Sequence, residues 1–119
     1  MNLREIDRLV AEHVMGWEPV YDDGDLISFV TEFGILFFSD DDEREWSPTI
    51  DIADAWQVVE KLNEDDFDFQ VWREKGKYNV EFSKDFFYLY GFAESETAPL
   101  AICLAALKAV GVEVEVIEQ

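Results

Sequence analysis

The sequence predicts an α+β fold, a three-layer α-β-α sandwich with a mainly antiparallel sheet, on three observations. Apolar residues recur at helical spacing in three stretches, residues 2–15, 52–62 and 100–110. Between them lie two groups of short segments with strand composition, separated by turn residues. The run 86–92 is apolar without alternation, as in strands that are covered on both faces. Such a strand needs helices on both sides of its sheet, which gives three layers.

The chain has 119 residues, the usual size of one domain, and 49% of them are apolar. A chain of this length can bury a core without disulfides or bound metal. It contains no linker-like segment, so residues 1–119 are predicted to form a single acidic domain.

The first helix is predicted over residues 2–15, with Asn2 as its cap and Gly16 as its end. Its apolar residues share one side, and the opposite side carries charged residues, namely Arg4, Glu5, Asp7, Arg8 and Glu12. Three strands are expected next, at 17–21, 26–31 and 35–38. The segment Asp22-Asp23-Gly24-Asp25 is typical of a hairpin turn between the first two.

The second helix is predicted over residues 52–62, capped by Asp51 or Thr49. Its expected buried stripe consists of Ile52, Ala55, Trp56, Val59 and Leu62. Two alternating strands follow, at 67–73 and 77–83, joined by a turn at 74–76. In the first strand Phe67, Phe69 and Val71 share one face, and in the second Tyr78, Val80 and Phe82 do.

The third helix, 100–110, has Lys108 as its only charged residue and is therefore predicted to be buried almost all round, ending at Gly111. A half-exposed strand is expected at 112–116, where valines alternate with glutamates. The predicted element order is α-β-β-β-α-β-β-β-α-β.

Acidic residues outnumber Lys and Arg by 28 to 9, which gives a net charge of −19. Nucleic-acid binding depends on cations that neutralise phosphates, so direct nucleic-acid binding is not expected. An anionic membrane surface is disfavoured for the same reason. With Cys103 as the only cysteine, no signal peptide and no apolar run long enough to span a bilayer, we expect a cytoplasmic protein.

Three stretches, residues 5–17, 51–62 and 96–109, together resemble the phage ABA sandwich domain, a family of small proteins from phages and prophages of Gram-positive bacteria such as bacilli. The resemblance runs in the same order over nearly the whole chain. It implies an α-β-α sandwich made in a bacterial cytoplasm and brings no activity and no functional residues with it. The family tends to have a Ser-Thr pair before the second helix, where this chain has Thr49-Ile50.

The sequence offers no catalytic constellation. Cys103 lies on the most apolar helix, where a core role is expected, and His13 lies near the end of the first helix, where a cation is favoured. No phosphate-binding glycine motif occurs, and among so many acids no carboxylate pair is informative. We therefore expect no enzyme and no cofactor, and a hydrolase is the least favoured alternative.

A dedicated metal site is not expected either. An EF-hand loop that began at Asp40 would have Glu45 where glycine is needed and Arg44 at a ligand position. The turn at 22–25 is too short to encircle an ion, and structural zinc is excluded because the chain has no Cys or His cluster.

The acidity itself then points to function. Acid runs occur at 22–25, 40–45, 64–68 and 94–96, in expected loops or element ends. The leading hypothesis is an interaction module that binds a basic surface of a protein partner, with DNA mimicry as one form of it and a merely solubilising charge as the plain alternative. The candidate interaction surface consists of Asp22, Asp23, Asp25, Asp40, Asp41, Asp42, Glu43, Glu45, Glu64, Asp65, Asp66 and Asp68.

The alternative is a small-ligand binder, for instance one that sequesters a nucleotide. Aromatic side chains could stack on a base, with Trp17, Trp46, Trp72 and Tyr88 as candidates, although each has a structural role to fill. Tyr88 is expected in the core. Phosphate binding would need a pocket that places an aromatic ring beside two or more cations, from among Arg4, Arg8, Arg44, Lys61, Arg73 and Lys77.

Overall fold

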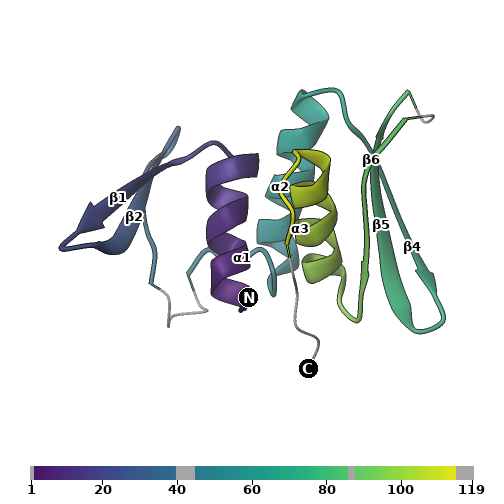
Figure 1. Ribbon diagram of the computed structural model, residues 1–119, viewed down its shortest axis with the longest axis horizontal. Helices are drawn as coiled ribbons and strands as arrows, with labels where there is room; N and C mark the ends of the chain where they lie inside the picture. The colour runs from purple at the N-terminus through teal and green to yellow at the C-terminus, as the bar shows by residue number, and fades with distance from the viewer. Residues whose placement is uncertain (1, 40–44, 86–87, 115–119) are drawn as a thin grey trace.

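The fold is a layer of helices between two antiparallel sheets (Figure 1). The computed structural model describes residues 2–39, 45–85 and 88–114. Its elements are α1 (Leu3–Leu9), the π-helical turn η1 (Val10–Val14), β1 (Glu18–Asp22), β2 (Asp25–Thr31), β3 (Gly34–Phe37), α2 (Ile52–Glu64), β4 (Asp68–Glu74), β5 (Lys77–Lys84), β6 (Tyr88–Ser95) and α3 (Ala98–Ala109). The predicted α+β class and the predicted order as far as α3 are confirmed. None of the helices in these ranges has the length and apolar character needed to cross a bilayer.

The strands form two sheets, ordered β1-β2-β3 and β4-β5-β6, and every pair is antiparallel. One sheet with helices outside it was predicted, whereas the helices lie between two sheets. The reason lies in β6, where Tyr88 is 66% exposed and Leu89 and Tyr90 are exposed as well. The apolar run that contains them is therefore not covered on both faces, and Tyr88 is not in the core.

The first helix begins and ends where the sequence predicts. The side chain of Asn2 accepts a hydrogen bond from the Glu5 N–H at 2.9 Å, and Gly16 has a φ of +73°. The last turn, η1, is π-helical, which the spacing did not predict. Arg4 and Asp7 were expected on the exposed side of this helix, and both are buried instead.

The two predicted hairpin turns are confirmed. In the first, Asp23 and Gly24 both have positive φ, and Asp22 pairs with Asp25. Lys75 and Gly76 occupy the same conformation between β4 and β5. Two successive residues with positive φ match the twist of the flanking strands, which favours a glycine at the second position.

Helix α2 is capped by Asp51, whose side chain accepts from the Asp54 N–H at 3.0 Å. Its buried residues are Ala55, Val58, Val59 and Leu62. Ile52 and Trp56, expected on the buried stripe, are about half exposed because α2 packs mainly on α3 and little on β4. The ring of Trp56 meets Phe69 edge-on, with centroids 5.7 Å apart.

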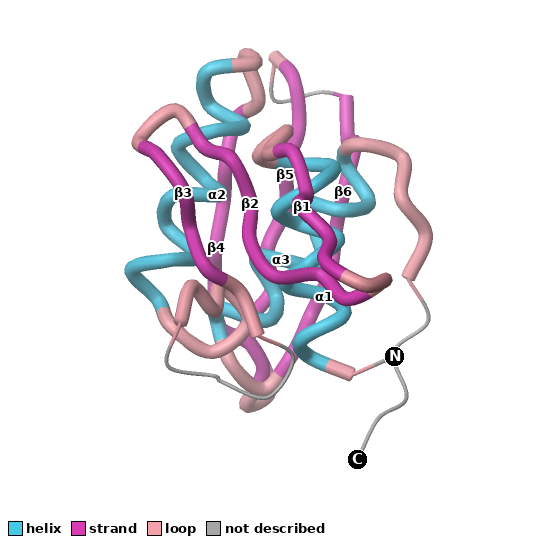
Figure 2. Tube along the Cα trace, turned by 90° about the vertical axis from the view of Figure 1, so that its left-hand side faces the viewer, coloured by secondary structure: helices cyan, strands magenta, loops and turns pink. Residues whose placement is uncertain are grey.

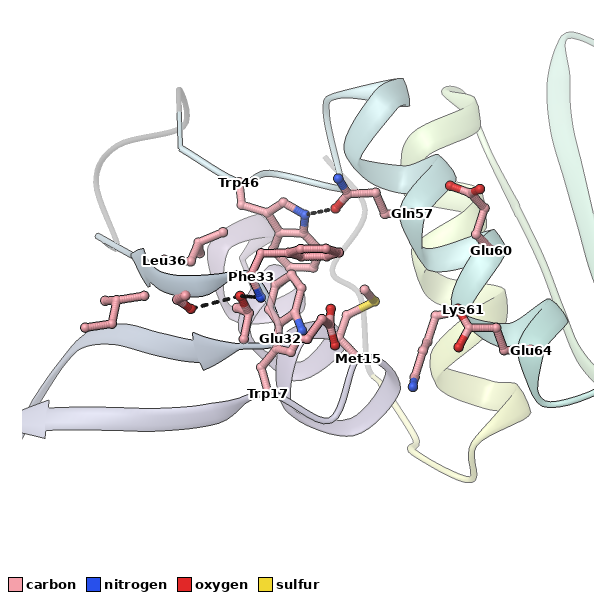
Figure 3. Close-up of a pocket in the computed structure, with 13 residues that line it drawn as sticks. Met15, Trp17, Glu32, Phe33, Leu36, Trp46, Gln57, Glu60, Lys61 and Glu64 are labelled. Atoms are coloured by element: carbon pink, nitrogen blue, oxygen red, sulfur yellow. Dashed lines mark hydrogen bonds between the residues drawn. The ribbon is translucent and has the colours of Figure 1, made fainter.

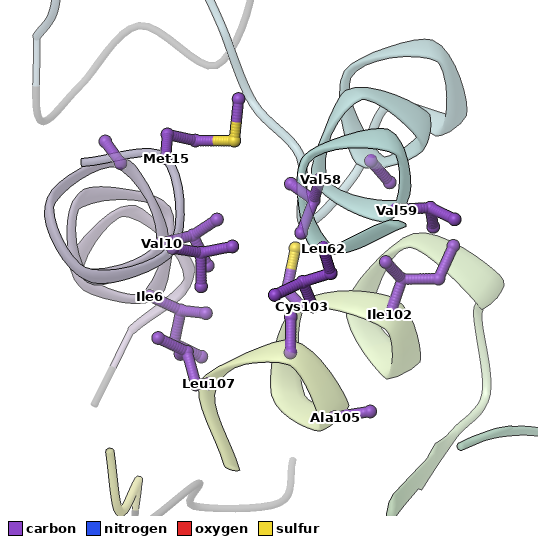
Figure 4. Close-up of a cluster of buried hydrophobic side chains, with 14 of the residues drawn as sticks. Ile6, Val10, Met15, Val58, Val59, Leu62, Ile102, Cys103, Ala105 and Leu107 are labelled. Carbon is purple, nitrogen blue, oxygen red and sulfur yellow. The ribbon is translucent and has the colours of Figure 1, made fainter. Parts of the chain in front are cut away.

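Helix α3 is the centre of the core and is buried almost all round, as predicted. Figure 4 shows Cys103 pointing into the space where Val10 of η1 and Val58 and Leu62 of α2 converge. The opposite side of α3 packs on β5 and β6. The inward face of that sheet contains Val80 and Phe82, which pair with Val71 and Phe69 as the strand alternation predicts.

The predicted strand at 112–116 is not present over residues 112–114, which form no regular element. Residues 115 and 116 lie outside the described part of the chain. The Val112 N–H donates to the Leu107 carbonyl at 2.9 Å, after Gly111 with a φ of +86° ends α3.

Helix α3 and its sheet approach each other closely at Gly91. A Cβ atom there would lie 2.1 Å from the Ala105 carbonyl oxygen and 2.6 Å from the Ala109 nitrogen. Both are backbone atoms of α3, which cannot rotate away.

We expect Gly91→Ala to lower the free energy of unfolding by about 3 kcal/mol, measured by urea titration. Gly76→Ala is the control: it meets nothing within 4 Å and loses about 1 kcal/mol through its positive φ alone. Equal losses would contradict this packing.

Candidate functional site

An open groove of about 710 Å³ lies between the β2–β3 hairpin and α2 (Figure 3). Its described lining comes from four regions: the segment that follows η1, the hairpin, the connection between β3 and α2, and the exposed side of α2. The residues are Met15, Trp17, Thr31, Glu32, Phe33, Gly34, Ile35, Leu36, Trp46, Gln57, Glu60, Lys61 and Glu64. Most of the groove is apolar, with polar groups at its rim, which is the usual composition of a binding site in a protein.

Two tryptophans form its floor. Trp17 and Trp46 are both buried, with ring centroids 4.6 Å apart and planes tilted by 58°. The Trp46 Nε1 donates to Gln57 Oε1 at 2.9 Å, which links the floor to α2. Among the described residues the Trp17 Nε1 has no acceptor. A buried donor without an acceptor costs about 1–3 kcal/mol, so one polar group of the floor is left unsatisfied.

The hairpin tip presents an apolar side chain at the mouth of the groove. Phe33 is 92% exposed. The Thr31 hydroxyl donates to the Gly34 carbonyl at 2.9 Å and accepts from the Phe33 N–H at 3.1 Å, so one side chain closes the turn. The hydrogen bonds of Thr31 thus define the turn that carries Phe33 (Figure 3).

The rim of the groove is acidic. Glu32 stands on the hairpin, and Glu60 and Glu64 stand one turn apart on α2. Lys61 is the only cation among the described lining residues. An acidic rim around an apolar groove favours a ligand that is apolar at its centre and positively charged at its edges.

A buried charge network holds Trp46 in place from below. The Arg4 Nη1 donates to the Trp46 carbonyl at 2.9 Å, the Asp7 Oδ2 at 2.8 Å and the Ser47 Oγ at 3.1 Å. Its Nε donates to the Ser39 carbonyl at 3.0 Å, and the guanidinium lies 3.8 Å from the centre of the Phe38 ring. Arg4 therefore ties α1 to both ends of the connection between β3 and α2.

Two carboxylates complete this network. The Thr49 N–H donates to Asp7 at 3.0 Å, and the Ser47 N–H donates to Asp54 at 2.8 Å. Burial raises the pKa of Asp7 above its ordinary value of 3.8, opposed by the hydrogen bonds from Thr49 and by Arg4. Burial also raises the pKa of Asp54, opposed by the Ser47 hydrogen bond and assisted by the charge of Asp51.

This network was not predicted from the sequence. Its one sequence signal is the opposite charge of Arg4 and Asp7 at a spacing of three, which also occurs on exposed helix faces. The two residues before α2 that correspond to the family's Ser-Thr pair are Thr49 and Ile50. Thr49 is buried, and Ile50 is exposed.

The acid runs of the candidate interaction surface lie at separate ends of the molecule. Residues 22–25 form the tip of the β1–β2 hairpin, 64–68 join α2 to β4 and 94–96 join β6 to α3 (Figure 1). Asp40, Asp41, Asp42 and Glu43 lie outside the described residues. Glu45 turns inward, with its carboxylate 3.6 Å from the Arg4 Nη2 and accepting from the Ser39 N–H. Of the predicted acids within the described ranges, only Glu64 lines the groove.

The remaining sequence candidates do not assemble into a chemical site. Within the described ranges, no three His, Cys, Asp or Glu residues gather as metal ligands. His13 is exposed on η1, whereas Cys103 is fully buried. Of the cations proposed for a nucleotide pocket, Lys61 alone is among the described residues of the groove. The groove with its tryptophan floor was not predicted, because its parts are brought together by packing between the layers.

Comparison with known proteins agrees with this architecture. The sequence pattern of the phage ABA sandwich domain matches residues 8–107. The fold is similar to the crystal structure of a phage protein from Bacillus cereus ATCC 14579, with a TM-score of 0.69 and 30% sequence identity. That similarity covers 97% of this chain and 93% of the other. No curated protein matches the chain.

Because the pKa values of Asp7 and Asp54 are raised, the free energy of unfolding should decrease as the pH rises. Because the folded chain binds these protons more tightly than the unfolded chain, their contribution is complete below pH 3.8 and is lost as the pH rises through the folded-state pKa. We expect the urea midpoint to fall as the pH rises above about 4. Asp54→Asn keeps an oxygen for the Ser47 N–H and should show a smaller fall. The same fall in both proteins would contradict the assignment.

The burial of Cys103 predicts an unreactive thiol. Burial raises its pKa well above 9.0, and the negative charges of Asp7 and Asp54 raise it further. Since the thiolate is the reactive form, we expect labelling by a thiol reagent in the folded chain to be at least about 100-fold slower than in urea. A native rate close to the rate in urea would place the thiol at an accessible surface.

Proposed function

Since the chain belongs to the phage ABA sandwich domain family, we propose that it is a non-enzymatic interaction module that binds a protein partner through a basic surface of that partner. The observation that carries the proposal is the open groove between the β2–β3 hairpin and α2, with its acidic rim and its exposed Phe33. In this proposal the partner contacts the groove, and not the loop acids that the sequence suggested. The other acids attract the basic partner from a distance.

The apolar part of the surface supports binding to a protein. Ile35 is 67% and Phe37 70% exposed, beside Phe33 on the same hairpin. Single exposed apolar residues are ordinary, but a row of three large ones next to a groove is typical of an interaction surface. Aromatic anchors such as Phe33 commonly supply much of the affinity of a protein interface.

The charge determines which partners are favoured. A net charge of −19 attracts basic proteins and repels acidic ones, and it raises the rate of encounter at low salt. The acidic rim extends this preference to the contact itself. The charge therefore selects the partner, and the apolar groove supplies the affinity.

A nucleotide-binding role is less well supported by the same groove. A phosphate group would meet Glu32, Glu60 and Glu64 there, against Lys61. The tryptophan rings of the floor are buried, so neither offers an open face on which a base could stack. A protein segment with basic side chains would be attracted by the rim acids that repel a phosphate, and it needs no stacking on the tryptophans.

Charge reversal separates a specific contact at the groove from general attraction. We expect Glu60→Lys with Glu64→Lys to weaken binding to a basic protein captured from a Bacillus cereus lysate by about tenfold or more at low salt. The control, Asp22→Lys with Asp25→Lys, changes the net charge equally at the distant hairpin and should have a smaller effect. Affinity is measured by titration calorimetry at two salt concentrations. Equal losses in the two variants would exclude the groove, and the absence of any salt-dependent partner would refute the proposed function.

A further inference from the structure

Strand β3 forms an open edge of the first sheet. In the described part of the chain it pairs with β2 only, and Figure 2 shows it at the margin of the sheet. The Phe38 N–H donates to the Ile27 carbonyl at 3.0 Å. Since backbone groups alternate between the two sides of an antiparallel strand, Ile35 and Phe37 direct their N–H and C=O groups to the free edge. The edge thus offers two donors and two acceptors to another strand.

This edge lacks the protection that open edges usually have. Proteins block such edges with charged residues or proline. The opposite edge of the same sheet, β1, has both, in Glu18, Pro19 and Asp22. Strand β3 has the sequence Gly-Ile-Leu-Phe, with neither. The two edges of one sheet therefore differ, and only β3 borders the groove.

A strand beside β3 would occupy the groove. Gly34, Ile35 and Leu36 all line it, so the free edge is one of its walls. Side chains alternate across a strand, and one set would therefore face the tryptophan floor while the other set lay beside Ile35 and Phe37 on the outer face. Basic residues at the ends of that strand would meet the rim acids Glu32, Glu60 and Glu64.

Charge decides between a second copy of this chain and another protein. Pairing two copies through β3 would bring together two chains with a net charge of −19 each, and their rim acids with them. Like charges placed opposite each other oppose association, whereas a basic segment gains from the same field. The occupant favoured by these observations is a segment of a basic protein.

We propose that the free edge of β3 binds an extended segment of a basic partner protein, which adds as a fourth strand to the sheet β1-β2-β3 and places alternate apolar side chains in the groove. This inference rests on the proposed function and specifies its contact. Main-chain hydrogen bonds along β3 supply part of the affinity, and the groove and its rim supply the preference for apolar residues flanked by Lys or Arg.

The test uses the whole chain and a synthetic peptide of Val, Ile and Thr flanked by lysine pairs. Hydrogen exchange of single amides is followed by NMR during titration. We expect exchange at Ile35 and Phe37 to slow by about tenfold or more on saturation, with no change in β1, the matched control edge. A peptide with proline at alternate positions lacks the pairing N–H groups and should not protect these amides.

A pair of variants tests the edge itself. Ile35→Pro removes an outward N–H at a position where an edge strand tolerates proline, and Ile35→Thr keeps that N–H. We expect the proline variant to lose peptide binding and the threonine variant to retain most of it. If Ile35→Pro fails to fold, the exchange measurement on the natural chain decides alone.

The outcomes separate this inference from the proposed function. Salt-dependent peptide binding without protection at β3 overturns the strand addition and leaves a basic partner in place. Capture of a basic protein from lysate, together with no peptide binding at low salt, also overturns it. Protection of Ile35 and Phe37 that increases with protein concentration in the absence of peptide identifies a second copy as the occupant, and refutes the basic segment. If no basic ligand of either kind binds, the proposed function fails as well.

Discussion

Burial of α3 almost all round is the constraint from which the rest of the structure follows. Lys108 is its one charged residue, and it reaches the surface to donate to the Phe92 carbonyl at 3.0 Å. A helix that is apolar all round is stable only when other elements surround it. Helices α1 and α2 cover one side of α3 and the β4-β5-β6 sheet covers the other, at a distance short enough to require Gly91. The first sheet is then left to pack on the far side of the helices.

That first sheet is attached in a different way, and the groove is the result. Aromatic rings from the sheet and from its connections to the helices fill the space beneath it: Trp17 and Trp46 pack on each other, and Phe29 packs edge-on against Phe38. The buried Arg4 then fixes the connection that carries Trp46. Buried ion pairs add little net stability but favour one arrangement over others, because a misplaced charge is costly. The sheet is therefore held at one end and stands open along β3.

Features that depend on local spacing could be predicted from the sequence. The caps at Asn2 and Asp51, both hairpin turns and the burial of α3 depend on residues close together in the chain, where turn and capping chemistry is specific. The layer order, the burial of Arg4 and the groove depend on which surfaces meet, and periodicity carries no information about that. Ile52 and Trp56 have the spacing of a core stripe. The side of α2 that is buried contains Val58 instead of these two residues. Among the described acids of the predicted interaction surface, Glu64 alone lines the groove, and it came from an acid run chosen only for its charge. Trp17, Trp46 and Lys61, named for a nucleotide pocket, line the groove as well.

The acidity and the open edge explain each other. An apolar, unblocked edge strand promotes association between identical chains, which most proteins prevent with charges placed on the strand itself. Here the charge lies elsewhere: on the rim of the groove and across the whole molecule, as a net −19. Repulsion between copies opposes self-pairing of β3, so under the strand addition proposed above the strand needs no blocking residues of its own. Since the same repulsion becomes attraction toward a cationic chain, the strand can remain open to a basic segment and closed to its own copies.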